Sequence, residues 1–170
     1  MVEKIRTALY GGSFNPIHQG HIALGDYLLQ HKLVDECWYV ISPQNPLKPD
    51  ANALDAWDRL EKVSLALKGH EGCLASDLEF GLPLPNFTAS TLRFAVEKYP
   101  DRDFVLLIGG DNLDVFTQWK DYLFILEHFD IYVYPRPGAT NLVPQGWKRV
   151  HLLEHAPLID ISSTQLRSKE

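Results

Sequence analysis

The chain has few cysteines, no long hydrophobic run and no excess of basic residues. Its two cysteines, Cys37 and Cys73, lie in or beside apolar stretches, so we expect buried free thiols and no disulfide framework. No apolar stretch approaches the ~20 residues that cross a bilayer. No secretory signal is apparent, because Glu3, Lys4 and Arg6 are followed at once by a short strand-like run and glycines. These absences predict a cytoplasmic protein without a membrane partner.

The charge balance is acidic, with a formal net charge of -6 and a pI of about 5.6. Nucleic-acid-binding proteins normally carry a basic face, so the sequence argues against a nucleic-acid partner. Any phosphate site must therefore be a local cluster of hydrogen-bond donors on a protein with a net negative charge. The length of 170 residues and the 45% hydrophobic content fit one globular domain, residues 1–170. A homo-oligomer is compatible with the sequence.

The hydrophobic pattern alternates between strands and helices. Short apolar or β-branched runs predict strands at 5–10, 37–41, 104–108, 131–134 and 149–153. Helical spacing predicts helices at 22–30, from a cap at Asp55 onward, from near Thr88 to Pro100, and at 122–129. Three prolines make 42–50 a loop. This order predicts a parallel sheet between layers of helices, with ligands at the carboxyl ends of its strands.

The most informative segment runs from Gly11 to His21 and reads Gly-Gly-Ser-Phe-Asn-Pro-Ile-His-Gln-Gly-His. The glycine pair after a strand suggests a tight turn and close approach of a ligand. His18 and His21 then fall near the first turn of a helix, where free N–H groups favour an anion, and Gly20 removes bulk between them. Two imidazoles there can donate hydrogen bonds to a phosphorus transition state. The alternatives are zinc ligands, for which no completing Cys or Glu follows, and surface histidines without a role.

A second segment, 161–167, reads Ile-Ser-Ser-Thr-Gln-Leu-Arg. Ser162 with Gln165 fits a capping box that starts a helix. The hydroxyls and free N–H groups at that start, with Arg167 one turn on, would hold a polyphosphate. The alternative is a plain helix cap with a solvated arginine.

The first segment resembles the signature of the HxGH nucleotidyltransferase superfamily. It is most similar to the nicotinate-nucleotide adenylyltransferases, whose pattern is Gly-Gly-Ser/Thr-Phe-Asp/Asn-Pro-Ile-His-x-Gly-His. The second segment resembles the same family's Ile-Ser-Ser-Thr-x-Ile/Leu-Arg motif, which binds ATP phosphates. The resemblance implies a Rossmann-like doubly wound parallel sheet with helices on both faces. The family chain usually continues into a further C-terminal helix, which is short or absent in this sequence.

The resemblance also implies a reaction. Nicotinate mononucleotide and ATP would give the deamido form of NAD and pyrophosphate, the mononucleotide phosphate attacking the α-phosphorus in line. The nucleophile is already an anion, so positioning and charge stabilisation are the protein's tasks. Mg²⁺ would enter bound to ATP, held by phosphates and water. The expected partners are therefore ATP and a pyridine mononucleotide.

Site residues follow from matching positions. The resemblance implies catalytic roles for His18, His21 and Lys48. It implies ATP contacts from Gly11, Gly12, Ser13, Phe14, Gly20, Asp111, Arg136, Ser162, Ser163, Thr164 and Arg167. It implies acceptor contacts from Asn15, Thr88 and Trp119, and it assigns no residue as a metal ligand.

Some of these matches are partial or have structural alternatives. Leu47 stands where the family usually has His before the lysine, and a solvated loop lysine is the other interpretation of Lys48. Thr88 could be a simple N-cap, and Trp119 could be a helix-packing residue. We interpret Asp55, Trp57 and Arg59 as structural.

Three rival functions remain open on the sequence alone. The acceptor could be nicotinamide mononucleotide or phosphopantetheine. The domain could bind nucleotides without catalysis. It could also be a metal-dependent hydrolase that uses His18, His21 and Asp111.

Overall fold

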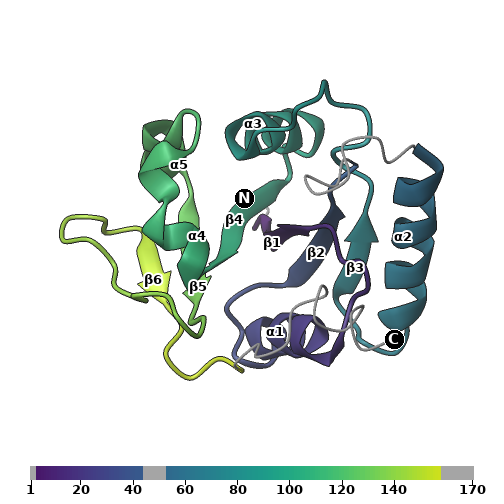
Figure 1. Ribbon diagram of the computed structural model, residues 1–170, viewed down its shortest axis with the longest axis horizontal. Helices are drawn as coiled ribbons and strands as arrows, with labels where there is room; N and C mark the ends of the chain where they lie inside the picture. Colours follow the sequence, from purple (N-terminus) through teal and green to yellow (C-terminus); the bar gives the residue numbers. More distant parts are fainter. Residues whose placement is uncertain (1–2, 44–52, 158–170) are drawn as a thin grey trace.

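A computed structural model describes residues 3–43 and 53–157 of the chain (Figure 1). Its centre is a six-stranded sheet of order β3-β2-β1-β4-β5-β6, in which every neighbouring pair is parallel. The strands are β1 (Ile5–Gly12), β2 (Glu36–Ile41), β3 (Cys73–Ser76), β4 (Arg102–Gly109), β5 (Asp130–Tyr134) and β6 (Val150–Leu152). The chain moves outward from β1 to β3 and then returns to place β4 on the other side of β1. This reversal puts a topological switch point between β1 and β4 and confirms the predicted doubly wound fold.

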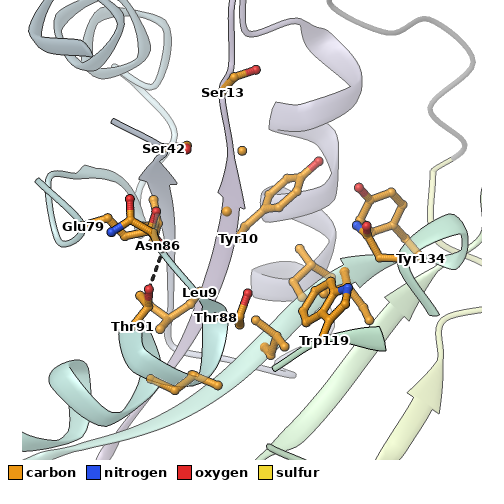
Figure 2. Close-up of a pocket in the computed structure, with 18 residues that line it drawn as sticks. Leu9, Tyr10, Ser13, Ser42, Glu79, Asn86, Thr88, Thr91, Trp119 and Tyr134 are labelled. Carbon is orange, nitrogen blue, oxygen red and sulfur yellow. Dashed lines mark hydrogen bonds between the residues drawn. The ribbon is translucent and has the colours of Figure 1, made fainter. Parts of the chain in front are cut away.

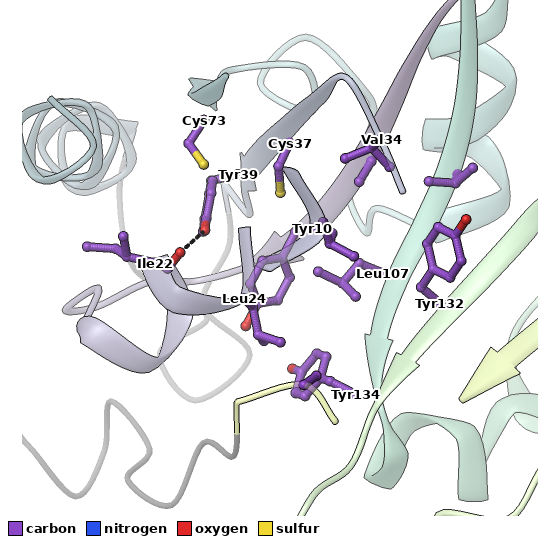
Figure 3. Close-up of a cluster of buried hydrophobic side chains, with 14 of the residues drawn as sticks. Tyr10, Ile22, Leu24, Val34, Cys37, Tyr39, Cys73, Leu107, Tyr132 and Tyr134 are labelled. Atoms are coloured by element: carbon purple, nitrogen blue, oxygen red, sulfur yellow. Dashed lines mark hydrogen bonds between the residues drawn. The ribbon is translucent and has the colours of Figure 1, made fainter. Parts of the chain in front are cut away.

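Helices cover both faces of the sheet (Figure 1). They are α1 (Gln19–Gln30), α2 (Ala53–Ala66), α3 (Thr88–Lys98), α4 (Gly110–Asp114) and α5 (Tyr122–His128), with a short 3₁₀ helix η1 (Phe116–Gln118). Alternate residues of the central strands enter two separate cores, as the period of a strand requires. Tyr10 and Leu107 pack with α1 and α2, whereas Leu9 and Leu106 pack with α3 and α5. Figure 3 shows the first of these cores, to which Tyr10, Tyr39 and Tyr134 all contribute.

The structure corrects several predicted element boundaries. The strand β3 was not predicted, because it has only four residues, of which Cys73 alone is buried. The short helices α4 and η1 were also missed, since fewer than two turns carry no periodic signal. Asp55 does not cap α2, which begins at Ala53; its carboxylate lies in the first turn and pairs with Arg59.

The structure also bears on the cysteines and on a possible membrane-spanning helix. Cys37 and Cys73 are free and buried on neighbouring strands, as predicted. Across residues 3–43 and 53–157, no helix has both the length and the apolar character that crossing a membrane requires.

Candidate active site

A cavity of about 390 Å³ opens beyond the carboxyl ends of β1 and β4, at the switch point of the sheet (Figure 2). The end of β1 contributes Tyr10 to Ser13, and the end of β4 contributes Leu106 to Ile108. The remaining wall comes mainly from α3, Trp119 and Tyr134. Parallel α/β sheets bind their ligands at this position, so the fold selects this cavity as the candidate active site.

The glycine pair has a different local role from the one predicted. Strand β1 continues through Gly12, and neither glycine has a positive φ, so the predicted tight turn is wrong. A Cβ atom at Gly12 would lie 3.2 Å from the Phe14 ring, whereas one at Gly11 would meet nothing within 4 Å. Gly12 therefore makes room for Phe14, and Gly11 leaves the cavity edge open.

Phe14 lies in an aromatic cluster and is not part of the cavity lining. The ring is 4% exposed, and its centroid lies 5.3 Å from that of Tyr10, 5.1 Å from that of His21 and 5.5 Å from that of Tyr39. Its backbone φ is 47°, in the left-handed region that L residues rarely adopt. The peptide bond between Asn15 and Pro16, directly after it, is cis. The chain thus makes an irregular turn between β1 and α1.

His18 and His21 cap α1 reciprocally. His18 is the N-cap, and its Nδ1 accepts a hydrogen bond from Gly20 N–H at 3.1 Å. His21 reaches back, and its Nδ1 accepts from His18 N–H, also at 3.1 Å. The two rings stack with centroids 3.7 Å apart. The sequence placed the histidines near the first turn correctly, but it did not predict that imidazoles would form a capping box, a role usually taken by hydroxyl and carboxylate side chains.

This capping fixes the tautomer of both rings. A backbone N–H always donates, so each Nδ1 is the unprotonated, accepting nitrogen and each ring carries its proton on Nε2. Burial, followed by the nearby His18 and Arg136, lowers the pKa of His21 to about 3. At neutral pH His21 is therefore an uncharged imidazole with one N–H donor.

The depressed pKa predicts a dependence of stability on pH. In the unfolded chain His21 titrates near 6.5 and in the folded chain near 3, so its full contribution to stability is present above pH 6.5. Below pH 6.5 only the unfolded chain takes up the proton, and up to ~1.4 kcal/mol of stability is lost per pH unit. We expect urea unfolding to show that the free energy of unfolding falls more steeply from pH 7.5 to 5 in wild type than in His21→Asn, because asparagine has no titratable group. Parallel pH curves for the two proteins would contradict this.

Tyr39 on β2 supports the histidine turn from below, a contact that sequence analysis missed. Its hydroxyl donates to the His21 carbonyl oxygen at 2.6 Å. Burial raises the pKa of Tyr39 well above its ordinary value, so the hydroxyl keeps its proton and remains a donor. Gly25 on the next turn of α1 leaves space for that hydroxyl, because a Cβ there would lie 2.3 Å from it. No local pattern signals a contact between residues 18 positions apart.

The cavity wall carries two of the three predicted acceptor residues. Thr88 and Trp119 both line the wall, as Figure 2 shows. Thr88 is the first residue of α3 and Phe87 is its N-cap, so the simple N-cap interpretation of Thr88 is wrong. Trp119 packs on Phe116 at a centroid distance of 4.8 Å and also faces the cavity.

Three polar residues of the same wall were not among the predicted site residues: Glu79, Asn86 and Thr91. The Thr91 hydroxyl donates to Glu79 Oε2 at 2.7 Å. Burial raises the pKa of Glu79, although that hydrogen bond opposes the shift. Glu79 is the one acidic side chain among the residues that line this cavity in the described part of the chain.

Asp111 and Arg136 lie close together beyond β4 and β5. Asp111 is in the first turn of α4, its side chain is 62% exposed, and its Oδ1 lies 4.0 Å from Arg136 Nε. Asn141 holds the Arg136 backbone on both sides, accepting from its N–H at 2.9 Å and donating to its carbonyl at 3.1 Å. The structure therefore brings this predicted pair together at the carboxyl edge of the sheet.

Other predicted residues do not line the cavity or lie outside the described residues. Asn15 lies in the turn between β1 and α1, and Gly20 lies in the first turn of α1. Neither these two residues nor His18 and His21 line the cavity. Tyr10 connects the histidine pair to the cavity. It lines the cavity, and its ring centroid lies 6.1 Å from that of His21. Five predicted residues lie outside the described residues: Lys48, Ser162, Ser163, Thr164 and Arg167.

The chain is similar to known nucleotidyltransferases over nearly its whole length. The sequence pattern of the cytidylyltransferase-like family matches residues 9–169. A relative from Cytophaga hutchinsonii, named a probable nicotinate-nucleotide adenylyltransferase, is 45% identical over 96% of this chain and 85% of its own. A relative of the same name from Bacteroides fragilis is 42% identical over 96% of this chain and 81% of its own. The chain belongs to the nicotinate-nucleotide adenylyltransferase family of cytidylyltransferase-like proteins.

A solved structure supports the fold independently. The nicotinic acid mononucleotide adenylyltransferase of Plasmodium falciparum, determined in complex with NaAD, superposes with a TM-score of 0.76. It shares 19% sequence identity, and the match covers 96% of this chain and 83% of that one. At this identity the likeness establishes the Rossmann-like fold.

Proposed function

We infer that this protein transfers the adenylyl group of ATP to nicotinate mononucleotide, giving deamido-NAD and pyrophosphate. The observation that carries this inference is 45% identity, over 96% of the chain, to a relative named for that activity. The cavity at the switch point and the paired histidines beside it supply a physical basis for the reaction. The metal-dependent hydrolase is disfavoured by family membership, and the non-catalytic alternative by the intact histidine pair.

The reaction replaces one phosphoanhydride bond by another. A phosphate oxygen of the mononucleotide attacks the α-phosphorus of ATP, and the bond from that phosphorus to the oxygen of the leaving pyrophosphate breaks. No proton has to be removed from the nucleophile, so catalysis depends on alignment and on stabilising charge that develops on the phosphoryl oxygens. We propose that the Nε2–H groups of His18 and His21 donate to those oxygens, each held in the required tautomer by a backbone N–H on Nδ1.

The remaining ATP contacts are also proposals. Gly11 would allow the phosphates to approach the end of β1, and Asp111 would accept from the adenosine ribose, with Arg136 on phosphate or adenine. Lys48 and the segment from Ser162 to Arg167 would enclose the triphosphate. Residues 3–43 and 53–157 contain no group of three or more His, Cys, Asp or Glu side chains suited to a metal. We propose that Mg²⁺ enters as part of the Mg–ATP substrate, because this ion keeps most of its water and is usually held by substrate phosphates.

The acceptor ring is proposed to lie against Trp119, near Thr88. Replacing Trp119 by alanine is expected to raise KM for nicotinate mononucleotide about fivefold, because an aromatic stack contributes roughly 1 kcal/mol beyond area burial. KM for ATP should change little. Steady-state kinetics with each substrate varied in turn would measure both. Trp57→Ala is the matched control, since Trp57 is 51% exposed and does not line the cavity. An unchanged acceptor KM in Trp119→Ala would remove Trp119 from the acceptor site.

The function itself is tested by identifying the products. Purified protein incubated with ATP, Mg²⁺ and nicotinate mononucleotide should form deamido-NAD and pyrophosphate in equal amounts, measured by chromatography with mass detection. No pyrophosphate should appear when the mononucleotide is omitted. Release of phosphate or pyrophosphate without an acceptor would instead indicate a hydrolase.

A further inference from the structure

Arg59 is a buried arginine that bridges two loops at the active-site edge of the sheet. It lies on α2, is 2% exposed, and is the largest of the fully buried side chains in the described part of the chain. Its Nη1 donates to the Ser13 carbonyl at 3.0 Å and to the Ser42 carbonyl at 2.7 Å. Its Nε donates to Asp55 Oδ2 at 3.1 Å, within the same helix. Burying a guanidinium is costly unless hydrogen bonds compensate it, so this arrangement calls for an explanation beyond simple packing.

The two carbonyls come from the loops that follow β1 and β2. The same loops are joined by a backbone hydrogen bond from Ser42 N–H to the Gly12 carbonyl at 2.9 Å. Both Ser13 and Ser42 line the cavity. Arg59 therefore ties a helix to both strand ends directly behind the cavity edge, and its charge strengthens each hydrogen bond.

The hydrogen bond to the Ser13 carbonyl affects the backbone conformation of Phe14, because this carbonyl belongs to the peptide plane that precedes Phe14. Rotation of that plane about the Phe14 N–Cα bond is the φ angle of Phe14, which is 47°. A left-handed conformation is unfavourable for an L residue and persists only where the surroundings hold it. Arg59 holds the peptide plane on one side, and the aromatic cluster holds the Phe14 ring on the other.

Phe14 in turn contacts His21. Their rings meet edge to face with centroids 5.1 Å apart, and Phe14 is four residues before His18 in the same turn. A change in the Ser13–Phe14 peptide would therefore displace the ring that packs on His21 and the chain that leads to the helix cap. This gives a continuous physical path from the guanidinium to the histidine pair.

We propose that Arg59 is a positioning residue for catalysis, which fixes the Ser13–Phe14 peptide and thereby the placement of His21 beside the cavity. It touches no substrate in this account. The turnover part of the test rests on the proposed function, whereas a second part, the titration of His21, does not.

The test compares variants on one helix. Arg59→Met keeps most of the side-chain volume but removes every donor, and Arg59→Lys keeps the charge but cannot reproduce the arginine fork. Lys62→Met is the matched control, because Lys62 forms an exposed ion pair with Asp58 at the same i,i+4 spacing on the same helix. We expect kcat to fall roughly 10–100-fold in Arg59→Met, with a smaller loss in Arg59→Lys, since a misplacement of about 1 Å costs up to 10²-fold. Lys62→Met should stay within about twofold of wild type, as exposed pairs contribute little.

The second measurement is NMR titration of the His21 ring in protein labelled on histidine. A loosened turn should expose His21, so its pKa should rise from about 3 toward its ordinary value in the Arg59 variants. An arginine that only stabilises the fold would change the melting temperature and leave that titration where it is.

Each outcome shows whether Arg59 positions His21 or only stabilises the fold. A folded Arg59→Met or Arg59→Lys protein with wild-type kcat and an unshifted His21 titration overturns the proposal. If Arg59→Met does not fold, Arg59→Lys is judged by the same two criteria. If wild type forms no deamido-NAD, the proposed function fails, and the His21 titration alone still decides the role of Arg59.

Discussion

Replacing His21 by alanine is expected to lower kcat by about 10²–10³, the usual cost of removing one donor to a transition-state oxyanion. The structure sharpens this expectation, because the Nε2–H of a neutral His21 is the donor and its Nδ1 is engaged with the His18 backbone. KM for ATP should change less than kcat, since the interaction is proposed to strengthen only in the transition state. The measurement is steady-state kinetics with ATP and nicotinate mononucleotide.

Two further substitutions separate donation from capping. In His21→Asn the amide oxygen lies near the position of Nδ1 and can still accept from His18 N–H, but no donor replaces Nε2. In His21→Gln the amide nitrogen can reach toward the Nε2 position, while the cap is lost. We therefore expect His21→Asn to keep the stability of wild type but to lose activity. His21→Gln should have a higher kcat than His21→Ala but should be less stable than His21→Asn. If His21→Ala turns over like wild type, the catalytic role of His21 is wrong.

Replacing Gly25 by alanine is expected to destabilise the protein by roughly 1–3 kcal/mol, as overpacking of a rigid core usually does. The new Cβ would lie 2.3 Å from the Tyr39 hydroxyl and 3.0 Å from Cys73 Sγ, and both side chains are buried in the core shown in Figure 3. Displacing that hydroxyl would also break its hydrogen bond to the His21 carbonyl, so kcat should fall together with stability.

Urea unfolding and steady-state kinetics measure the two consequences. Gly81→Ala is the control, because a Cβ there meets nothing within 4 Å. Tyr39→Phe removes the hydrogen bond without a clash and should cost about 1 kcal/mol, the net contribution of one hydrogen bond. A Gly25→Ala protein as stable as Gly81→Ala would contradict the contact between α1 and β2.

The sequence predicted the parts of the fold and site that depend on local pattern. Five strands, four helices and the position of the histidines at the start of α1 follow from residue spacing over short windows. The parallel order of the sheet follows from the alternation of strands and helices. Family membership, predicted from the segment 11–21 and from 161–167, is confirmed by the relatives.

The features that sequence analysis missed depend on distant parts of the chain. Tyr39 reaches a carbonyl 18 residues earlier, and Arg59 reaches one 46 residues earlier, so no periodicity or short motif records either contact. Arg59 was interpreted as structural, but nothing in its sequence context predicted that the structure would bury it. The wall formed by Glu79, Asn86 and Thr91 likewise exists only once α3 is placed against the sheet.

The identity of the acceptor decides the reaction, and it is tested by comparing acceptors. Pyrophosphate release from ATP should be measured with nicotinate mononucleotide, nicotinamide mononucleotide and phosphopantetheine, each over a range of concentrations. We expect kcat/KM for nicotinate mononucleotide to exceed clearly the values for the other two acceptors. Equal or greater kcat/KM with either rival acceptor, or no release with any of them, would contradict it.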